Sequence, residues 1–181
     1  MQMTNMGNNG LFNFKTVIVL IVIIVLSSLS FLVVLRIDSF VHEDLYSYGL
    51  QFDLLWANDY WFNKNMLLTF LAGTTVLCAL SLLPHFDHSK QPTFFSKWAG
   101  NLIPIVATIY MIFSISFFLR IDDIIKNSLP QYGVSLSYTW TAEYWNLNTI
   151  LITLMITSLM LLIIPILRTL EILEFELEDK D

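Results

Sequence analysis

The chain has 181 residues, a formal net charge of −6 and a mean hydropathy of +0.66, with 56% hydrophobic and 13% charged residues. A soluble domain carries about 25% charged residues, so this composition indicates a membrane protein. The acidic balance argues against a nucleic-acid-binding protein, which needs a basic surface. A single cysteine, Cys78, excludes an internal disulfide.

Long apolar blocks without any charged residue occupy four stretches: 16–35, 65–83, 99–119 and 144–167. A helix needs about 20 apolar residues to cross a ~30 Å hydrocarbon core. Irregular backbone cannot face lipid, because its N–H and C=O groups would lack hydrogen-bond partners. We therefore predict an all-α membrane protein with four transmembrane helices. The first block is interpreted as a retained span, because no signal-peptidase site of the Ala-x-Ala type follows it.

These blocks divide the chain into five parts. Residues 1–13 are polar and are predicted to be a disordered N-terminus. Two two-span units follow at 14–84 and 99–168, joined by a linker at 85–98, and an acidic tail closes the chain at 169–181. Lysines and arginines near the span ends set the orientation of a membrane protein, and the basic linker favours the cytoplasmic side. We expect a cell-membrane protein with both termini in the cytoplasm.

The two units repeat each other. The letters LRID occur at 35–38 and 119–122, which places Arg36 and Arg120 84 positions apart. At this offset the following loop repeats its aromatic and glycine residues: Tyr48, Gly49, Trp56, Tyr60 and Trp61 correspond to Tyr132, Gly133, Trp140, Tyr144 and Trp145. We predict a tandem duplication of a two-helix hairpin. Units with two spans insert in the same direction, so a pseudo-two-fold axis along the membrane normal is expected.

Apolar and polar residues alternate over residues 134–140 of the second repeated loop, and over 50–56 of the first except at Leu55. Alternation is typical of a β-strand. A lone strand is unstable, but the pseudo-two-fold axis would bring each strand beside its twin. We therefore predict a small antiparallel two-stranded ribbon on the outer face of the bundle.

The segment YGLQFDLLWANDYW, residues 48–61, resembles a motif in uncharacterised four-span membrane proteins of archaea. The resemblance covers the two loops and the adjoining span ends. It implies a four-span fold and carries no activity, so no functional residue follows from it.

Charged residues at the span ends form one candidate site. Arg36 with Asp38, and Arg120 with Asp122, could bind lipid headgroups or a small anion. Alternatively each arginine reaches toward the interface and pairs with a carboxylate of its own or of the sister repeat. We favour the second interpretation, with the four residues forming ion pairs that hold the repeats together.

Aromatic residues form a second candidate site, a shallow groove between the repeats for a lipid, a quinone-like molecule or a helix of a partner. Its expected lining is Trp56, Tyr60, Trp61, Trp140, Tyr144 and Trp145. The simpler interpretation is an aromatic belt that anchors the protein at the membrane interface.

Two groups of residues have the side chains of a metal site: Asp38, His42 and Glu43, and the loop with His85, Asp87 and His88. Such spacings do occur among metal ligands. However, Lys126 occupies the repeat position of His42, so the ligand set is not repeated. We predict no metal site, no cofactor and no catalytic residues.

The sequence thus favours a non-catalytic integral membrane protein, an accessory or scaffold subunit acting through its extracytoplasmic loops. A small transporter or channel is the alternative, and the lack of charge within the four blocks weakens it. A membrane enzyme using Asp38, His42 and Glu43 has thinner support. The expected partners are the lipid bilayer and a membrane protein or a second copy of the chain, and not nucleic acid.

Overall fold

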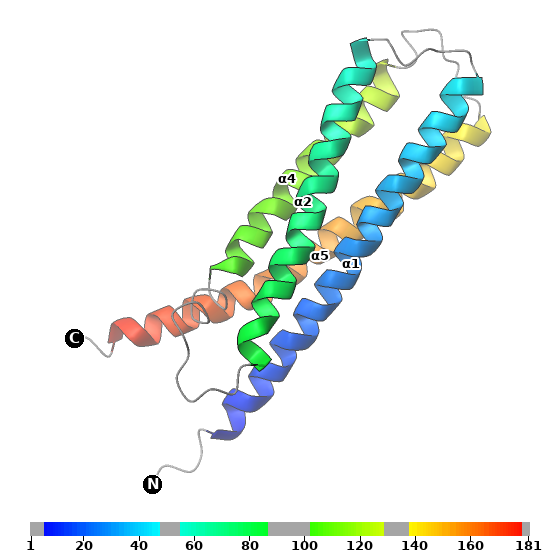
Figure 1. Cartoon of the computed structure of the whole chain (residues 1–181). Helices are drawn as coiled ribbons and strands as arrows, with labels where there is room; N and C mark the ends of the chain where they lie inside the picture. The colour runs from blue at the N-terminus through cyan, green and yellow to red at the C-terminus, as the bar shows by residue number, and fades with distance from the viewer. Residues whose placement is uncertain (1–5, 48–54, 87–101, 129–137, 179–181) are drawn as a thin grey trace.

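The computed structural model describes residues 6–47, 55–86, 102–128 and 138–178, with side chains over 14–42, 58–83, 102–127 and 142–167. The described chain is entirely helical (Figure 1). Its elements are α1 (Met6–Ser47), α2 (Leu55–Phe86), α4 (Ile103–Asp123), the π-helical turn η1 (Ile124–Ser128) and α5 (Tyr138–Glu178).

Four stretches of these helices are long and apolar enough to cross a membrane: Phe14–His42, Asn58–Leu83, Ile103–Asn127 and Ala142–Leu167. The prediction of an all-α chain with four such helices is confirmed, and the protein is a multi-pass membrane protein. At one end, however, these stretches extend beyond the charge-free blocks. There they include charged residues next to the charge-free blocks, among them Asp38, Lys64 and Asp122.

The ribbon prediction fails where the structure can test it. Residues 55–56 belong to α2 and residues 138–140 to α5, so the ends of both predicted strands are helical. The remainder, 50–54 and 134–137, lies outside the described residues. Alternation over a few residues does not distinguish a strand from the first turn of a helix. Once a long span is nucleated, extending it by a turn satisfies further backbone groups at little cost.

The first and last helices continue toward both ends of the chain. Residues 6–13, expected to be disordered, form the start of α1, and α5 continues through the acidic tail as far as Glu178. Helix propagation from a nucleated span again accounts for this extension. The first residue of α1 and the last residue of α5 lie at the same end of the molecule (Figure 1).

The helices alternate in direction and form a ring (Figure 1). Helix α1 contacts α2 and α5, and α4 contacts the same two helices. The pairs α1 with α4, and α2 with α5, make no contacts across their described residues, so they lie on the diagonals. This is the arrangement that a two-fold axis relating the two hairpins would produce.

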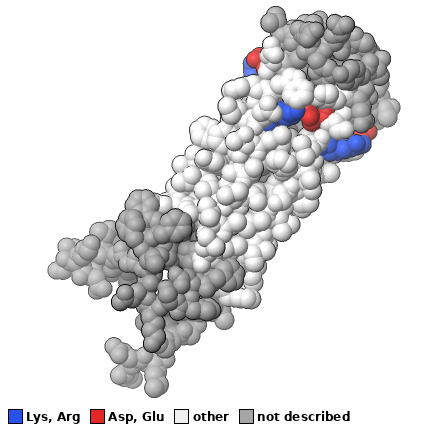
Figure 2. Space-filling model, in the orientation of Figure 1, with Lys and Arg blue, Asp and Glu red and all other residues white. Residues whose placement is uncertain are grey.

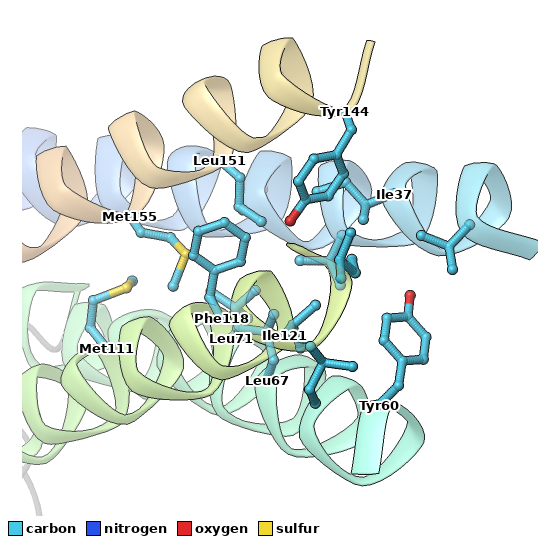
Figure 3. Close-up of a cluster of buried hydrophobic side chains, with 14 of the residues drawn as sticks. Ile37, Tyr60, Leu67, Leu71, Met111, Phe118, Ile121, Tyr144, Leu151 and Met155 are labelled. Carbon is cyan, nitrogen blue, oxygen red and sulfur yellow. The ribbon is translucent and has the colours of Figure 1, made fainter. Parts of the chain in front are cut away.

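Buried residues recur at alternating spacings of three and four along every helix. In α1, for example, the positions are 20, 23, 27, 30, 34, 37 and 41. A spacing of this kind is a heptad pattern, which places one seam of each helix against its neighbours and gives the shallow crossing angles of a four-helix bundle. Figure 3 shows part of the resulting core, with Leu67, Leu71, Met111, Phe118, Leu151 and Met155 gathered between the helices.

The burial pattern repeats at the same offset as the sequence. Every buried position from Leu20 to Ser81 has a buried position 84 residues later, except Asn63, whose counterpart Leu147 is half-buried. An offset of 84 is twelve heptads, so the phase of the seam is the same in both hairpins. The match in burial therefore covers the described parts of both pairs of spans.

The contact between α2 and α4 is aromatic. Phe70 stacks on Phe113 and Phe117 with ring centroids 5.3 and 5.6 Å apart, and meets the edge of Tyr110 at 5.1 Å. Gly73 makes this approach possible, because a Cβ at that position would lie 2.6 Å from the Tyr110 ring. The corresponding edge, between α5 and α1, carries Leu154 in place of Phe70 and Leu26 in place of Tyr110.

Candidate functional site

Charged side chains gather near one end of the bundle, while the visible face of the middle is uncharged (Figure 2). Asp38, on α1, is the centre of the first cluster. The Tyr60 hydroxyl donates a hydrogen bond to Oδ1 of Asp38 at 3.0 Å, and Nζ of Lys64 donates to Oδ2 at 2.9 Å. Tyr60 and Lys64 lie one turn apart on α2, so their side chains emerge from the same face.

This first cluster is closed toward the core. Tyr60 is 1% exposed, and the side chain of Lys64 is 8% exposed. Nζ of Lys64 also lies 3.5 Å from the centre of the Trp61 ring. His42 approaches from the other side, with Nδ1 3.6 Å from Oδ1 of Asp38 and its ring against the edge of Trp61. The Asp38 carboxylate, the Lys64 ammonium and the rings of Tyr60, Trp61 and His42 thus pack together.

The second cluster is built around Asp122, on α4. The Tyr144 hydroxyl donates to Oδ1 of Asp122 at 2.7 Å, and Nδ2 of Asn148 donates to the same oxygen at 2.6 Å. Nζ of Lys126, in η1, lies 2.5 Å from Oδ2 and 3.9 Å from the centre of the Trp145 ring. Tyr144 is 2% exposed, so this cluster is also closed toward the core.

The two clusters correspond at the offset of 84, with one exchange. Asp, Tyr and Trp occupy equivalent positions in both hairpins. The lysine does not, because Lys64 corresponds to Asn148 and Lys126 corresponds to His42. Each carboxylate nevertheless has one lysine on Oδ2 and one tyrosine on Oδ1.

The two clusters compensate for the desolvation of the Asp38 and Asp122 carboxylates. The Asp38 and Asp122 side chains are each 17% exposed, and an isolated carboxylate in that position would lose most of its hydration. A lysine neutralises each charge, and the hydroxyl and amide donors occupy further lone pairs. Both oxygens of each carboxylate are therefore engaged within the same hairpin. The arrangement joins α1 to α2 and α4 to α5.

The predicted ion pairs between the repeats are distributed differently from expectation. Asp38 and Asp122 pair within their own hairpins, as described above. Arg36 does cross between hairpins, but its partner is Glu143 on α5, with Nη2 3.5 Å from Oε1. Arg120 pairs with Asp123 on its own helix at 3.1 Å. For Arg120 and Asp122 the partner that competes successfully, Asp123 or Lys126, lies one turn away along the same stretch of helix.

The structure does not support Tyr60 and Tyr144 as the lining of an open groove. Both rings point into the core from α2 and α5 (Figure 3), and both hydroxyls are engaged by carboxylates. Trp61 is half-buried and Trp145 is exposed, and each presents a face to a lysine ammonium. The side chains of Trp56 and Trp140 lie outside the described residues.

The residues considered for metal binding are not assembled within the described part of the chain. There, no group of three or more His, Cys, Asp and Glu side chains is close enough to hold an ion. The side chains of Glu43, His85, Asp87 and His88 lie outside the described residues. His42 and Asp38 are neighbours, with Lys64 beside them on Asp38.

Neither Lys64 nor Asn148 is among the site residues predicted from the sequence. One signal was present: each follows its tyrosine by four positions, and helical spacing aligns both with that tyrosine. The lysine exchange at the offset of 84 was a second signal.

A scan against protein-family models, a search of curated proteins and a search of solved structures each found no match to this chain.

Proposed function

We propose that the chain is a non-catalytic integral membrane protein, an accessory or scaffold subunit built from a duplicated two-helix hairpin. The duplication is supported by the shared buried positions and by the recurrence of the Asp–Tyr–Trp contacts, all at the offset of 84. The resemblance to uncharacterised four-span proteins of archaea fits the same architecture and adds no activity to it.

The observation that carries the functional proposal is how the two largely buried carboxylates, Asp38 and Asp122, are paired. A carboxylate within a membrane span is by default a candidate for ion or proton transport. Here each is neutralised by a lysine and hydrogen-bonded by a tyrosine of the same hairpin. A side chain so engaged stabilises the bundle. The surface available for function is then the lipid-facing perimeter and the loops, which fits a protein that works by assembling with another.

The experiment compares assembly with transport. The chain is purified in a mild detergent after crosslinking in its native membrane, and its mass and stoichiometry are measured. We expect a complex of fixed stoichiometry with one other membrane protein or a second copy, and proteoliposomes of the purified chain without proton or ion flux. Saturable flux that disappears in an Asp38→Asn variant would overturn the proposal.

A small ion-coupled transporter is the second candidate, and one observation favours it. Asp38, Lys64 and Asp122 lie within the apolar stretches and are largely buried, which removes the main argument against transport that the sequence offered. A transporter requires the Asp38–Lys64 pair to open during the cycle. The flux measurement above therefore distinguishes the two functions.

We further propose that the protein resides in the cell membrane with both termini in the cytoplasm. The common end of the first and last helices and the basic linker support this orientation. Labelling of single cysteines placed at each terminus, in a Cys78→Ala background, tests it. An impermeant thiol reagent applied to intact cells should leave both terminal cysteines unmodified.

A further inference from the structure

A lysine ammonium occupies the same surroundings in both hairpins, although it arrives from a different helix in each. Lys64 extends from α2, the second helix of its hairpin, whereas Lys126 extends from the π turn that follows α4, the first helix of its hairpin. Both ammonium groups nevertheless contact Oδ2 of an aspartate and the face of a tryptophan.

The residues that surround the ammonium group are the same in both hairpins: an aspartate, a tyrosine and a tryptophan. The aspartate offers a full negative charge, and the tyrosine hydroxyl occupies its other oxygen and so directs Oδ2 toward the cation. The tryptophan ring offers the negative face of its π system, which attracts a cation within about 6 Å. An ammonium group can contact the carboxylate oxygen and the ring face at the same time, whether its carbon chain comes from the first or the second helix of the hairpin.

We propose that each Asp–Tyr–Trp set is an ammonium-binding site in its own right, with a lysine of the chain as its resident occupant. The first site is formed by Asp38, Tyr60 and Trp61, and the second by Asp122, Tyr144 and Trp145. The ligand class is the primary alkylammonium ion. A primary ammonium can donate a hydrogen bond to Oδ2 and still face the ring, whereas a quaternary ammonium has no N–H to donate. The site therefore discriminates between these two kinds of cation.

The second site is the accessible one, because the side chain of Lys126 is 31% exposed. A Lys126→Ala variant vacates it while Asn148 continues to hold Asp122. The buried thiol of Cys78, the only cysteine of the chain, reports opening of the bundle through its rate of reaction with a thiol-specific dye. We expect faster labelling in Lys126→Ala than in the wild type.

The test is rescue by n-propylammonium chloride in detergent solution. Labelling of Lys126→Ala should slow saturably, by about tenfold when the ammonium concentration is ten times its dissociation constant, because a ligand that binds only the folded state suppresses opening in proportion. Tetramethylammonium chloride and 1-propanol should have no such effect. The wild type and a Lys15→Ala variant, which loses an exposed lysine outside the sites, should not respond either. Absence of rescue, or equal rescue in Lys15→Ala, would overturn the proposal.

A second set of variants tests the first site without an added ligand. In Lys64→Asn the cation is lost, and Cys78 should be labelled faster. Adding His42→Lys to that variant copies the arrangement of the second hairpin, and labelling should return to within about twofold of the wild type, since the ammonium would again reach the same oxygen and ring. If the double variant is labelled as fast as Lys64→Asn, the site does not accept an ammonium from α1 and the proposal fails.

Discussion

At the scale of single residues, the phenol hydroxyl of Tyr60 contributes to the stability of the charged cluster around Asp38. It is the donor that fixes one oxygen of Asp38 while Lys64 neutralises the other. A buried acceptor that loses its donor retains the cost of desolvation without the compensating hydrogen bond. The tyrosine is therefore needed for its oxygen as well as for its ring.

Removing that hydroxyl gives the residue-scale prediction. Tyr60→Phe should lower the free energy of unfolding by about 1–3 kcal/mol, the range for an unsatisfied buried partner of a charged group. Tyr110→Phe is the matched control, because the Tyr110 hydroxyl makes no hydrogen bond to the described residues. The measurement is unfolding by sodium dodecyl sulfate, followed by far-UV circular dichroism. Equal midpoints for the two variants would contradict the role given to the Tyr60 hydroxyl.

At the scale of elements, the two edges between hairpins are unequal at the charged end. Arg36 and Glu143 join α1 to α5, and the same offset makes Arg120 and Asp59 the corresponding pair between α4 and α2. Arg120 instead pairs with Asp123, one turn away. The position equivalent to Asp123 in the first hairpin is Ser39, which offers no competing charge. One residue thus accounts for the asymmetry of the two ion pairs.

Replacing that residue should restore the symmetry. In an Asp123→Ser background, Arg120 is free to reach Asp59, and a double-mutant cycle between Arg120→Ala and Asp59→Ala should give a coupling of about 0.2–1 kcal/mol, as for other exposed pairs. In the wild-type background the same cycle should give a coupling near zero. High salt should remove the coupling, because exposed charges are screened. A coupling unaffected by the Asp123→Ser change would refute this account.

At the scale of the whole molecule, the first residue of α1 and the last residue of α5 lie at the same end of the bundle as the end of α2 and the start of α4 (Figure 1). Each hairpin also closes its own ionic cluster. The order of the hairpins along the chain therefore contributes little to the contacts that hold the bundle together.

A circular permutant can test whether the order of the hairpins matters. It begins at residue 102, runs to the original C-terminus, continues through a flexible linker into the original N-terminus and ends at residue 86, so that residues 87–101 are omitted. We expect it to insert with both hairpins in the wild-type orientation and to label at Cys78 within about threefold of the wild-type rate. Permutation is generally tolerated where chain ends lie close together on the surface. A permutant that is degraded, or labelled as fast as a denatured sample, would show that the order of synthesis matters.

How far the sequence predicts this molecule depends on the range of the interactions involved. The four helices follow from apolar length alone, which is a local property. The contacts of Asp38 depend on which turn of α2 lies beside it, and that is set by packing of heptads along the whole bundle. For this reason neither the pairing of Asp38 with Lys64 nor that of Asp122 with Asn148 can be predicted from local sequence.

The exchange of lysine between helices also restricts the history of the chain under the proposed duplication. If both hairpins descend from one ancestor, the lysine must have changed position in at least one of them, between the position of Lys64 and that of Lys126. Losing the lysine first would leave a buried carboxylate without its cation, a change that costs about 3–5 kcal/mol where a buried pair is broken. Gaining the second lysine first leaves only a surplus cation at the margin of the span. The tolerated order is therefore gain before loss, and an ancestral hairpin carrying lysines at both positions is its expected intermediate.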